Sequence, residues 1–292
     1  MPMTPPNGKT AILLLHSPLR QGIAASLTEF IYEHGGHIVG HDQHVDPENQ
    51  LYFSRVEWSM EGFGIAEDDL AEVFEHRLAR PYQMTWQLHF SDEVYRMAIF
   101  VSRASHCFFD ILSRHQSGEW NVEIPLVISN HPDLEPAAHR AGIDFHCLPI
   151  GPDNKQAQEV KQLALLEEKG VDFIVLARYM QILSGAFISH YVNRIINIHH
   201  SFLPAFKGAR PYHAAHARGV KLVGATAHYV TEELDDGPII EQGITRITHT
   251  NSIDDLIRKG RDVERLTLAR AIWCHIQRRI IVSNGRTVVF SD

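Results

Sequence analysis

From Met97 onward, short apolar runs alternate with longer amphipathic stretches, and this rhythm restricts the fold more than any other feature of the sequence. A short apolar run predicts a strand buried on both faces, and an intervening helix allows the next strand to run parallel to it. The pattern therefore predicts an α/β fold with a doubly wound, mostly parallel, Rossmann-like sheet. The expected strands are 97–102, 123–129, 145–150, 172–177 and 195–199, followed by 224–230 and 239–247.

Two of the expected helices have readable limits. The stretch 154–170 is amphipathic and ends at a glycine, and the stretch 252–277 begins at Ser252 with Asp255 three residues later, a capping pattern. In the first of these helices, apolar side chains at helical spacing predict the face that is buried. These side chains are Val160, Leu163, Ala164 and Leu166.

The first 90 residues follow a different order, βαββαβ, which is the split ferredoxin-like motif. The polar link 91–96 separates it from the alternating region, so we expect a domain over 1–92 and a second over 93–292. The strands expected in the first domain are 10–15, 37–45, 51–58 and 84–90, and its helices are 22–36 and 66–79.

Composition narrows the class of protein. A formal net charge of −8 argues against non-specific nucleic-acid binding. The three cysteines are far apart and odd in number, which argues against a disulfide framework and fits a reducing compartment. No run of apolar residues is long enough to cross a membrane, and the start lacks the apolar core of a secretory signal. We therefore expect a cytoplasmic protein without membrane or nucleic-acid partners.

The end of the fifth expected strand, "NIHHS", carries the strongest chemical signal. Asn197 and His199 are two residues apart on a strand and so share a face. An amide and an imidazole that converge on one point suit a carbonyl oxygen that becomes an oxyanion. "ELDDG" offers an aspartate, Asp235 or Asp236, that would orient the imidazole or accept a proton from water.

These histidines allow two other interpretations, a metal site and a structural role. Neighbouring residues on a strand face opposite sides, and neither His199-His200 nor His213-x-x-His216 has a companion Cys or an HExxH arrangement. We therefore expect no metal and no bound cofactor. The other interpretation is that His199 is a structural histidine, which would be the default for a histidine that stood alone.

The segment "NIHHSFLPAFKGARPYHAAHARGVKLVGATAHYVTEELDDGPII" resembles the catalytic half of enzymes that use 10-formyltetrahydrofolate. Their shared pattern is Asn-x-His-x-Ser-hydrophobic-Leu-Pro followed by a Leu-Asp-x-Gly-Pro loop, and "INIHHSFLPAF" with "GARPYHAA" is closest to the formyltetrahydrofolate deformylases. The first 90 residues resemble an ACT domain, a βαββαβ module that binds amino acids. That pairing is characteristic of this family.

The resemblance implies a role for particular residues. Its catalytic Asn, His and Asp fall on Asn197, His199 and Asp235, and Asp236 occupies the variable position. Backbone groups around Met180, Gln181 and Leu183 would pair with the pterin edge, and Gln181 stands where the family often has Arg. In the ACT domain the effector loop "HSPLRQGI" contains Gly22 at the family's turn and Leu19 where an acidic residue is usual. The full set implied to bind substrate is Met180, Gln181, Leu183, His200, Ser201 and Gly237.

The activity implied is hydrolysis of 10-formyltetrahydrofolate to tetrahydrofolate and formate, which supplies formate for purine synthesis and balances one-carbon pools. The purine-pathway transferase relative has a Gly-rich phosphate loop where this chain reads "VSRASHC", without glycine, so water is the expected acceptor. Two alternatives remain: a folate-dependent formyltransferase with an unidentified acceptor, and a non-catalytic amino-acid sensor. The resemblance also implies a homo-oligomer, with a tetramer favoured, and an amino-acid effector.

Overall fold

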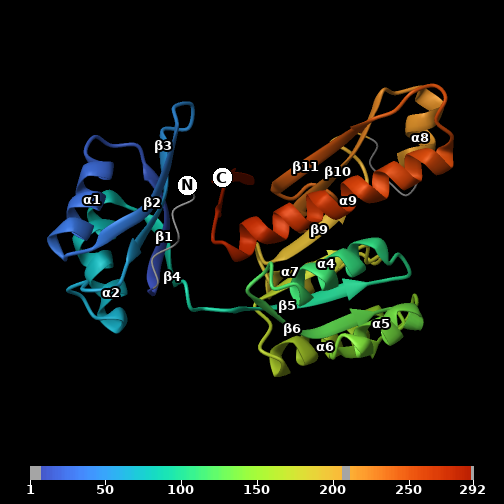
Figure 1. Cartoon of the computed structure of the whole chain (residues 1–292), viewed down its shortest axis with the longest axis horizontal. Helices are drawn as coiled ribbons and strands as arrows, with labels where there is room; N and C mark the ends of the chain where they lie inside the picture. Colours follow the sequence, from blue (N-terminus) through green and yellow to red (C-terminus); the bar gives the residue numbers. More distant parts are fainter. Residues whose placement is uncertain (1–7, 206–210, 291–292) are drawn as a thin grey trace. The chain divides into compact units, whose positions relative to one another are not determined.

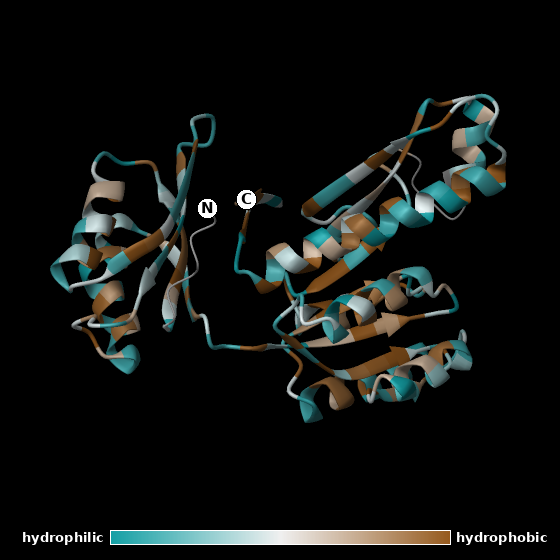
Figure 2. Ribbon diagram, in the orientation of Figure 1, coloured by the Kyte–Doolittle hydropathy of each residue, from teal (hydrophilic) through white to brown (hydrophobic). Residues whose placement is uncertain are grey.

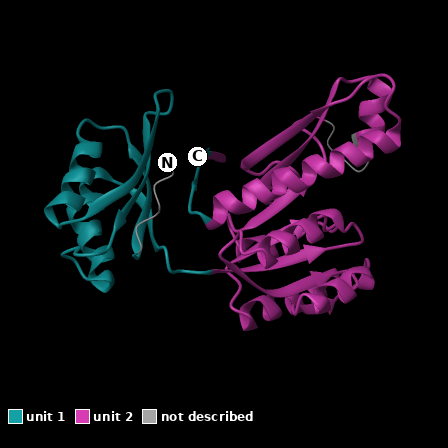
Figure 3. Ribbon diagram, viewed as in Figure 1, with its two compact units in different colours: residues 1–94, 277–283, 288–292 teal, residues 95–276, 284–287 magenta. Residues whose placement is uncertain are grey.

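The chain is described by a computed structural model that covers residues 8–205 and 211–290. It divides into two compact units (Figure 3). Unit 1 contains the residues up to Val94 together with Gln277–Ser283 and the residues from Val288 onward. Unit 2 contains Tyr95–Ile276 and Asn284–Thr287.

Unit 1 has the βαββαβ order expected from the sequence, with its strands in one antiparallel sheet of order β2-β3-β1-β4. Helices α1 and α2 lie on the same face of this sheet (Figure 1). After α2 the helix continues through a π-helical turn, η1, and a short helix, α3. The elements are β1 (Thr10–Pro18), α1 (Ile23–Glu33), β2 (His37–Asp46), β3 (Leu51–Ser59), α2 (Glu67–Phe74), η1 (Glu75–Ala79), α3 (Arg80–Tyr82) and β4 (Thr85–Phe90).

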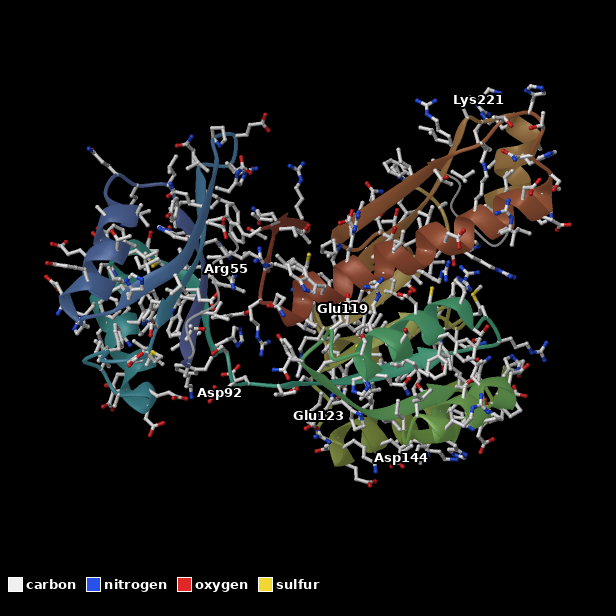
Figure 4. The ribbon with its side chains drawn as sticks, viewed as in Figure 1. Arg55, Asp92, Glu119, Glu123, Asp144 and Lys221 are labelled. Carbon is white, nitrogen blue, oxygen red and sulfur yellow. The ribbon has the colours of Figure 1, made fainter. Side chains whose placement is uncertain are left out.

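The sheet of unit 1 is covered on its second face by the end of the chain. Leu14 of β1 and Phe53 of β3 pack with Ile281 and Phe290, and all four are buried. The guanidinium Nε of Arg55, labelled in Figure 4, donates to the carbonyl oxygen of Arg278 at 3.0 Å. The C-terminal residues form a two-stranded sheet of β12 (Ile280–Ser283) and β13 (Arg286–Val289).

This packing changes the expected domain limits. The boundary lies between Val94 and Tyr95, two residues after the one expected, and the chain beyond Ile276 does not belong wholly to the second domain. The apolar residues of β12 and β13 complete the core of unit 1, a long-range contact that no local pattern reveals. The residues Gln277–Ser283 and those from Val288 onward, which were expected in the second domain, belong to unit 1.

Unit 2 is built on a seven-stranded sheet of order β11-β10-β9-β8-β5-β6-β7. The five strands from β9 to β7 are parallel, and β10 and β11 run antiparallel at one edge. The mostly parallel α/β fold is therefore confirmed. The strands are β5 (Tyr95–Val101), β6 (Val122–Ser129), β7 (Asp144–Cys147), β8 (Phe173–Ala177), β9 (Ile195–His199), β10 (Leu222–Tyr229) and β11 (Ile239–Arg246).

Helices cover both faces of this sheet, and its central strands are mostly apolar (Figure 2). Helices α6 and α7 contribute to one buried cluster, and α4 packs against α9 on the other side. The helices are α4 (His106–Gln116), η2 (Pro132–Leu134), α5 (Glu135–Arg140), α6 (Lys155–Glu168), α7 (Gly185–Ser189), α8 (Pro211–Arg218) and α9 (Ile253–Ile276).

The buried face of α6 differs from the one expected. Leu166 is buried, but Val160 is 63% exposed and Ala164 is also exposed. The face turned inward carries Glu159 and Gln162, because Glu159 accepts hydrogen bonds from the backbone N–H (2.9 Å) and hydroxyl (2.5 Å) of Ser184. The predicted buried face was wrong for Val160 and Ala164, because the apolar residues of α6 lie on more than one face of the helix. Polar partners on other segments decide which of these faces is turned inward.

The capping pattern before α9 is confirmed. The Ser252 hydroxyl accepts from the backbone N–H of Asp255 at 3.2 Å, and the Asp255 carboxylate accepts from the backbone N–H of Ser252 at 3.0 Å. Among the described residues, no helix is both long and apolar enough to cross a membrane.

Candidate active site

Strand β9 carries Asn197 and His199 to the carboxyl end of the parallel sheet. The strand lies between β8 and β10, and its apolar Ile195, Ile196 and Ile198 are buried, which holds its backbone in place. His199 is itself only 6% exposed, whereas Asn197 is partly exposed. The two side chains therefore occupy the position where ligands bind in open α/β sheets.

Asp235 meets His199 from the loop between β10 and β11. One carboxylate oxygen, Oδ1, lies 3.2 Å from His199 Nδ1, and the Asp235 side chain is 12% exposed. The backbone of Asp235 has a φ of 55°, a left-handed conformation that Asp tolerates better than most residues. The hydrogen bond from His199 lowers the pKa of Asp235 below its ordinary value, against the opposing effect of burial, so the carboxylate is ionised at neutral pH.

The pairing of Asp235 with His199 leaves one imidazole nitrogen for other chemistry. His199 Nε2 is buried and has no hydrogen-bond partner within residues 8–205 and 211–290. The neighbouring Asp236 is exposed, and the carboxylate oxygen 3.2 Å from His199 Nδ1 belongs to Asp235. Of the two aspartates that local sequence analysis left open, Asp235 is the one at the imidazole.

A second histidine, which sequence analysis did not identify, orients the amide of Asn197. His228 on β10 lies directly opposite Asn197 in the β9–β10 ladder, and its Nε2 accepts from Asn197 Nδ2 at 3.2 Å. Its Nδ1 donates to the carbonyl oxygen of Tyr229 at 2.9 Å, which sets the tautomer. Burial is the main cause that lowers the pKa of His228, so the ring is neutral and Nε2 can accept.

These side chains line a cavity of about 280 Å³ together with the segment that follows β8. Met180, Gln181, Leu183 and His200, four of the six expected substrate-binding residues, line it. The segment 230–235 lines it as well. The cavity therefore brings an amide, an imidazole and a carboxylate into a largely apolar cleft.

Ser201 and Gly237, the other two, do not line this cavity. Ser201 is buried and donates its hydroxyl to the carbonyl oxygen of Ala205 at 2.8 Å, and it borders a second cavity of about 230 Å³. Gly237 is packed against the backbone, and a Cβ there would lie 1.8 Å from the carbonyl oxygen of Tyr229. Both residues shape the loops next to the cavity.

The backbone of Met180 is partly engaged within the protein. Its N–H donates to Ser102 Oγ at 3.0 Å, and Ser102 in turn donates to Asn130 Oδ1 at 2.6 Å. The expected backbone pairing with a pterin must therefore use other groups of this segment than the Met180 N–H.

The two expected effector residues lie in unit 1, at the start of α1. Gly22 has a φ of 90° and open space where a Cβ would be, so its backbone conformation explains the glycine. Leu19 is partly buried and packs against the core of unit 1. An apolar side chain held in this way offers no acceptor to an ammonium group.

Among the described residues, one group of side chains has the proximity of metal ligands: His106, Cys107 and Glu264. His106 Nε2 already lies 2.8 Å from a Glu264 oxygen, and the Arg178 guanidinium is 3.4 Å from that same oxygen. A fixed cation at this distance opposes a metal ion. Burial raises the pKa of Cys107, which keeps the thiol protonated.

Comparison with known proteins places the chain in a family. The formyl transferase family model matches residues 95–272. The chain is 54% identical to a formyltetrahydrofolate deformylase of Synechocystis, over 97% of this chain and 99% of the relative, and 45% identical to that of Bacillus subtilis, over 96% and 93%. A crystal structure of a formyltetrahydrofolate deformylase from Pseudomonas syringae pv. tomato has a TM-score of 0.95 at 40% identity and covers 98% of this chain and 96% of that one.

Transferases of the same fold are more distant. The structure of glycinamide ribonucleotide transformylase 1 from Symbiobacterium toebii has a TM-score of 0.64 at 30% identity and covers 70% of this chain and 98% of that one. Fold and site thus define a formyl-transferase-type α/β enzyme with an added N-terminal unit. Within that class, the chain belongs to the formyltetrahydrofolate deformylase family.

Proposed function

We propose that this protein hydrolyses 10-formyltetrahydrofolate to tetrahydrofolate and formate. The observation that carries the proposal is the His199–Asp235 pair, 3.2 Å apart and beside Asn197, in a chain similar along nearly its whole length to formyltetrahydrofolate deformylases. Proposed catalytic residues are Asn197, His199 and Asp235. His228 is proposed as a positioning residue.

The reaction begins with activation of a water molecule. The Asp235 carboxylate orients the water and, together with His199, accepts one of its protons. The oxygen then bonds to the formyl carbon, whose carbonyl electrons move to its oxygen. Asn197 Nδ2 and protonated His199 donate to this oxyanion, and each such donor contributes roughly 3 kcal/mol to stabilisation of the transition state.

Collapse of the tetrahedral intermediate breaks the bond between the formyl carbon and N10 of the folate. N10 takes up a proton, so tetrahydrofolate leaves as the amine and the formyl group leaves as formate. The hydrogen bond from Asn197 to the neutral His228 holds one amide N–H and turns the other toward the cavity. An amide fixed in this way needs no reorganisation when the oxyanion forms.

The test is a product assay in the absence of any acceptor. Incubation with 10-formyltetrahydrofolate should release formate and tetrahydrofolate in equal amounts. Activity should persist after treatment with a chelator, because we propose a mechanism without metal. Loss with chelator and recovery with zinc would overturn the metal-free mechanism, and release of tetrahydrofolate without formate would overturn hydrolysis.

A formyltransferase with another acceptor is the second candidate, favoured by the 30% identity to a transformylase of this fold. It predicts that tetrahydrofolate appears only after a cell extract or an amine is added. Release in buffer alone separates the two functions.

For unit 1 we propose a role in assembly and control. Its ACT-like topology supports edge-to-edge pairing into a homo-oligomer, and the partly buried Leu19 supports weak or altered binding of an amino-acid effector. Sedimentation of the purified chain, with and without glycine or methionine, measures both properties.

A further inference from the structure

The topological switch point of unit 2 lies between β5 and β8. These strands are neighbours in the sheet, and the chain leads from β5 toward β6 on one side and from β8 toward β9 on the other. In doubly wound sheets this crevice is where a ligand binds. Here two side chains that follow these strands contact the same carboxylate, that of Glu264: His106 at the start of α4, after the loop that follows β5, and Arg178 directly after β8.

A single buried carboxylate joins these side chains. Glu264 of α9 is 1% exposed, and it accepts from His106 Nε2 at 2.8 Å and from the Tyr212 hydroxyl at 2.7 Å. The Arg178 Nε lies 3.4 Å from Glu264 Oε2, close enough for an ion pair, although this Nε makes no hydrogen bond within residues 8–205 and 211–290. Burial alone would raise the pKa of Glu264, but these contacts lower it, so the carboxylate is charged. The crevice is thus filled by an ion pair of the protein itself.

Arg178 holds its place at a backbone cost. Its φ of 64° lies in the left-handed region, which is strained for a non-glycine residue and is typical of functional sites. A glycine at residue 178 would adopt this backbone conformation without strain. The presence of an arginine there must therefore be explained by what its side chain does. That side chain is mostly buried and lines the same cavity as Asn197 and His199.

The filled crevice adjoins the catalytic residues through aromatic contacts. The rings of His199 and His200 are 5.2 Å apart, and those of His200 and Tyr212 are 5.9 Å apart. Tyr212 then bonds to Glu264. Arg178 itself lines the cavity of Asn197 and His199, so its ion pair with Glu264 lies beside the proposed catalytic residues.

We propose that Arg178, anchored by Glu264, determines acceptor specificity by occupying the space that an amine acceptor would need. The inference rests on the proposed hydrolysis of 10-formyltetrahydrofolate. With the crevice filled, water is the nucleophile small enough to reach the formyl carbon. The acceptor class excluded is a nitrogen nucleophile with an NH₂ group, which covers primary amines and hydroxylamine.

Removal of the Arg178 side chain opens the crevice beside a carboxylate that accepts N–H donors. An amine bound there attacks the formyl carbon, a C–N bond to the amine forms, and the bond to N10 breaks. The proton lost by the amine is taken up by N10. The products are tetrahydrofolate and a formamide; with hydroxylamine the second product is formohydroxamic acid.

The experiment compares products formed from 10-formyltetrahydrofolate in buffer with hydroxylamine, after subtraction of the enzyme-free reaction. Formate, formohydroxamic acid and tetrahydrofolate are each quantified for the unaltered protein and for Arg178→Gly, Arg178→Lys and Arg103→Gly. Glycine suits the left-handed backbone at residue 178. Arg103→Gly is the matched control because it removes an exposed arginine from the loop after β5.

For Arg178→Gly we expect the ratio of formohydroxamic acid to formate to rise at least tenfold. Arg178→Lys, which keeps a long cationic side chain in the crevice, and Arg103→Gly should both keep the ratio of the unaltered protein. A ratio that stays unchanged while tetrahydrofolate is still released overturns the inference. Absence of tetrahydrofolate release from the unaltered protein instead overturns the proposed function, so the two failures differ.

Arg178→Gly leaves Glu264 with one cation fewer, and the variant is first checked by circular dichroism. If it does not fold, the same assay is made with Arg178→Gly combined with Glu264→Gln, which removes the unpaired charge. The crevice is open in that variant too, so its product ratio should also rise. An unchanged ratio in the folded double variant overturns the inference as well.

Discussion

His228 accepts a hydrogen bond from the amide of Asn197, with 3.2 Å between His228 Nε2 and Asn197 Nδ2, across the ladder between β9 and β10. This contact decides which way the amide of Asn197 turns. A residue without any assigned contact with substrate thereby controls a proposed oxyanion donor.

We expect His228→Ala to lower kcat by about 10–100-fold, with a smaller effect on KM, because a loosely held amide stabilises the transition state less. Asn197→Ala should cost more, about 100–1,000-fold. If His228 acts through Asn197, the double variant is no slower than Asn197→Ala. His216→Ala, which removes an exposed histidine of α8, is the control. Additive losses would show that His228 has an independent role.

Asp235→Asn should reduce kcat by about 100-fold or more, because an amide can neither accept the proton of water nor stabilise a protonated His199. Asp236→Asn should stay within a few-fold of the unaltered protein, since Asp236 is exposed beside it. The measurement is formate release from 10-formyltetrahydrofolate. Equal losses would mean that the wrong aspartate has been assigned.

The stability of unit 1 should depend on pH through His89. Burial first, and then repulsion by Arg278, lower the pKa of His89 to about 4, against the attraction of Glu93. In the unfolded state His89 has a pKa near 6.5 and binds a proton that the folded state does not bind. The free energy of unfolding therefore falls as the pH drops from about 6.5 to about 4. His89→Gln should flatten this part of the pH profile of the unfolding midpoint. An identical profile would exclude His89 as the cause.

Phe290→Ala should lower the free energy of unfolding by about 3–4 kcal/mol, because the buried ring packs on Leu14 and Phe53. Tyr32→Ala, at an 81% exposed position of the same unit, should change it by less than about 0.5 kcal/mol. Urea unfolding measures both. Equal small effects would show that the C-terminal strands contribute little to unit 1.

Leu19→Asp should create or strengthen amino-acid binding, because a carboxylate at the turn before Gly22 can accept from the ammonium group of a ligand. The unaltered protein should bind glycine and methionine weakly, since Leu19 packs against the core of unit 1. Calorimetric titration of both proteins tests this. Tight binding by the unaltered protein, lost on substitution of Gly22 and unaffected by Leu19→Asp, would contradict the prediction.

The residues of the site that lie on one strand could be predicted from the sequence. The residue that depends on how β9 and β10 pair could not. The two-residue period of a strand places Asn197 and His199 on one face. His228 was missed because its pairing with Asn197 joins residues 31 positions apart in sequence. The choice between Asp235 and Asp236 rested on the family resemblance. The backbone of Asp235 is left-handed, but this conformation could not be predicted because the residue is not a glycine.

The same distinction holds for the fold. The alternation of apolar runs with amphipathic stretches was sufficient to predict the mostly parallel sheet of unit 2, and the capping pattern of Ser252 and Asp255 was sufficient to predict the start of α9. Apolar spacing failed for α6, where the buried Glu159 depends on Ser184, 25 residues away. It also failed for the C-terminal strands, whose apolar residues find their partners in β1 and β3.

The packing of Ile281 and Phe290 on β1 and β3 has a consequence for synthesis of the chain on the ribosome. Leu14 and Phe53 emerge first, and the residues that cover them are made about 200 residues after β4, the last strand of this sheet. At about 5–20 residues per second, the first sheet waits roughly 10–40 s with one apolar face open to water. During that interval the nascent chain presents an apolar surface of the kind that chaperones bind, and unit 1 closes only after Ile281 and Phe290 have been made.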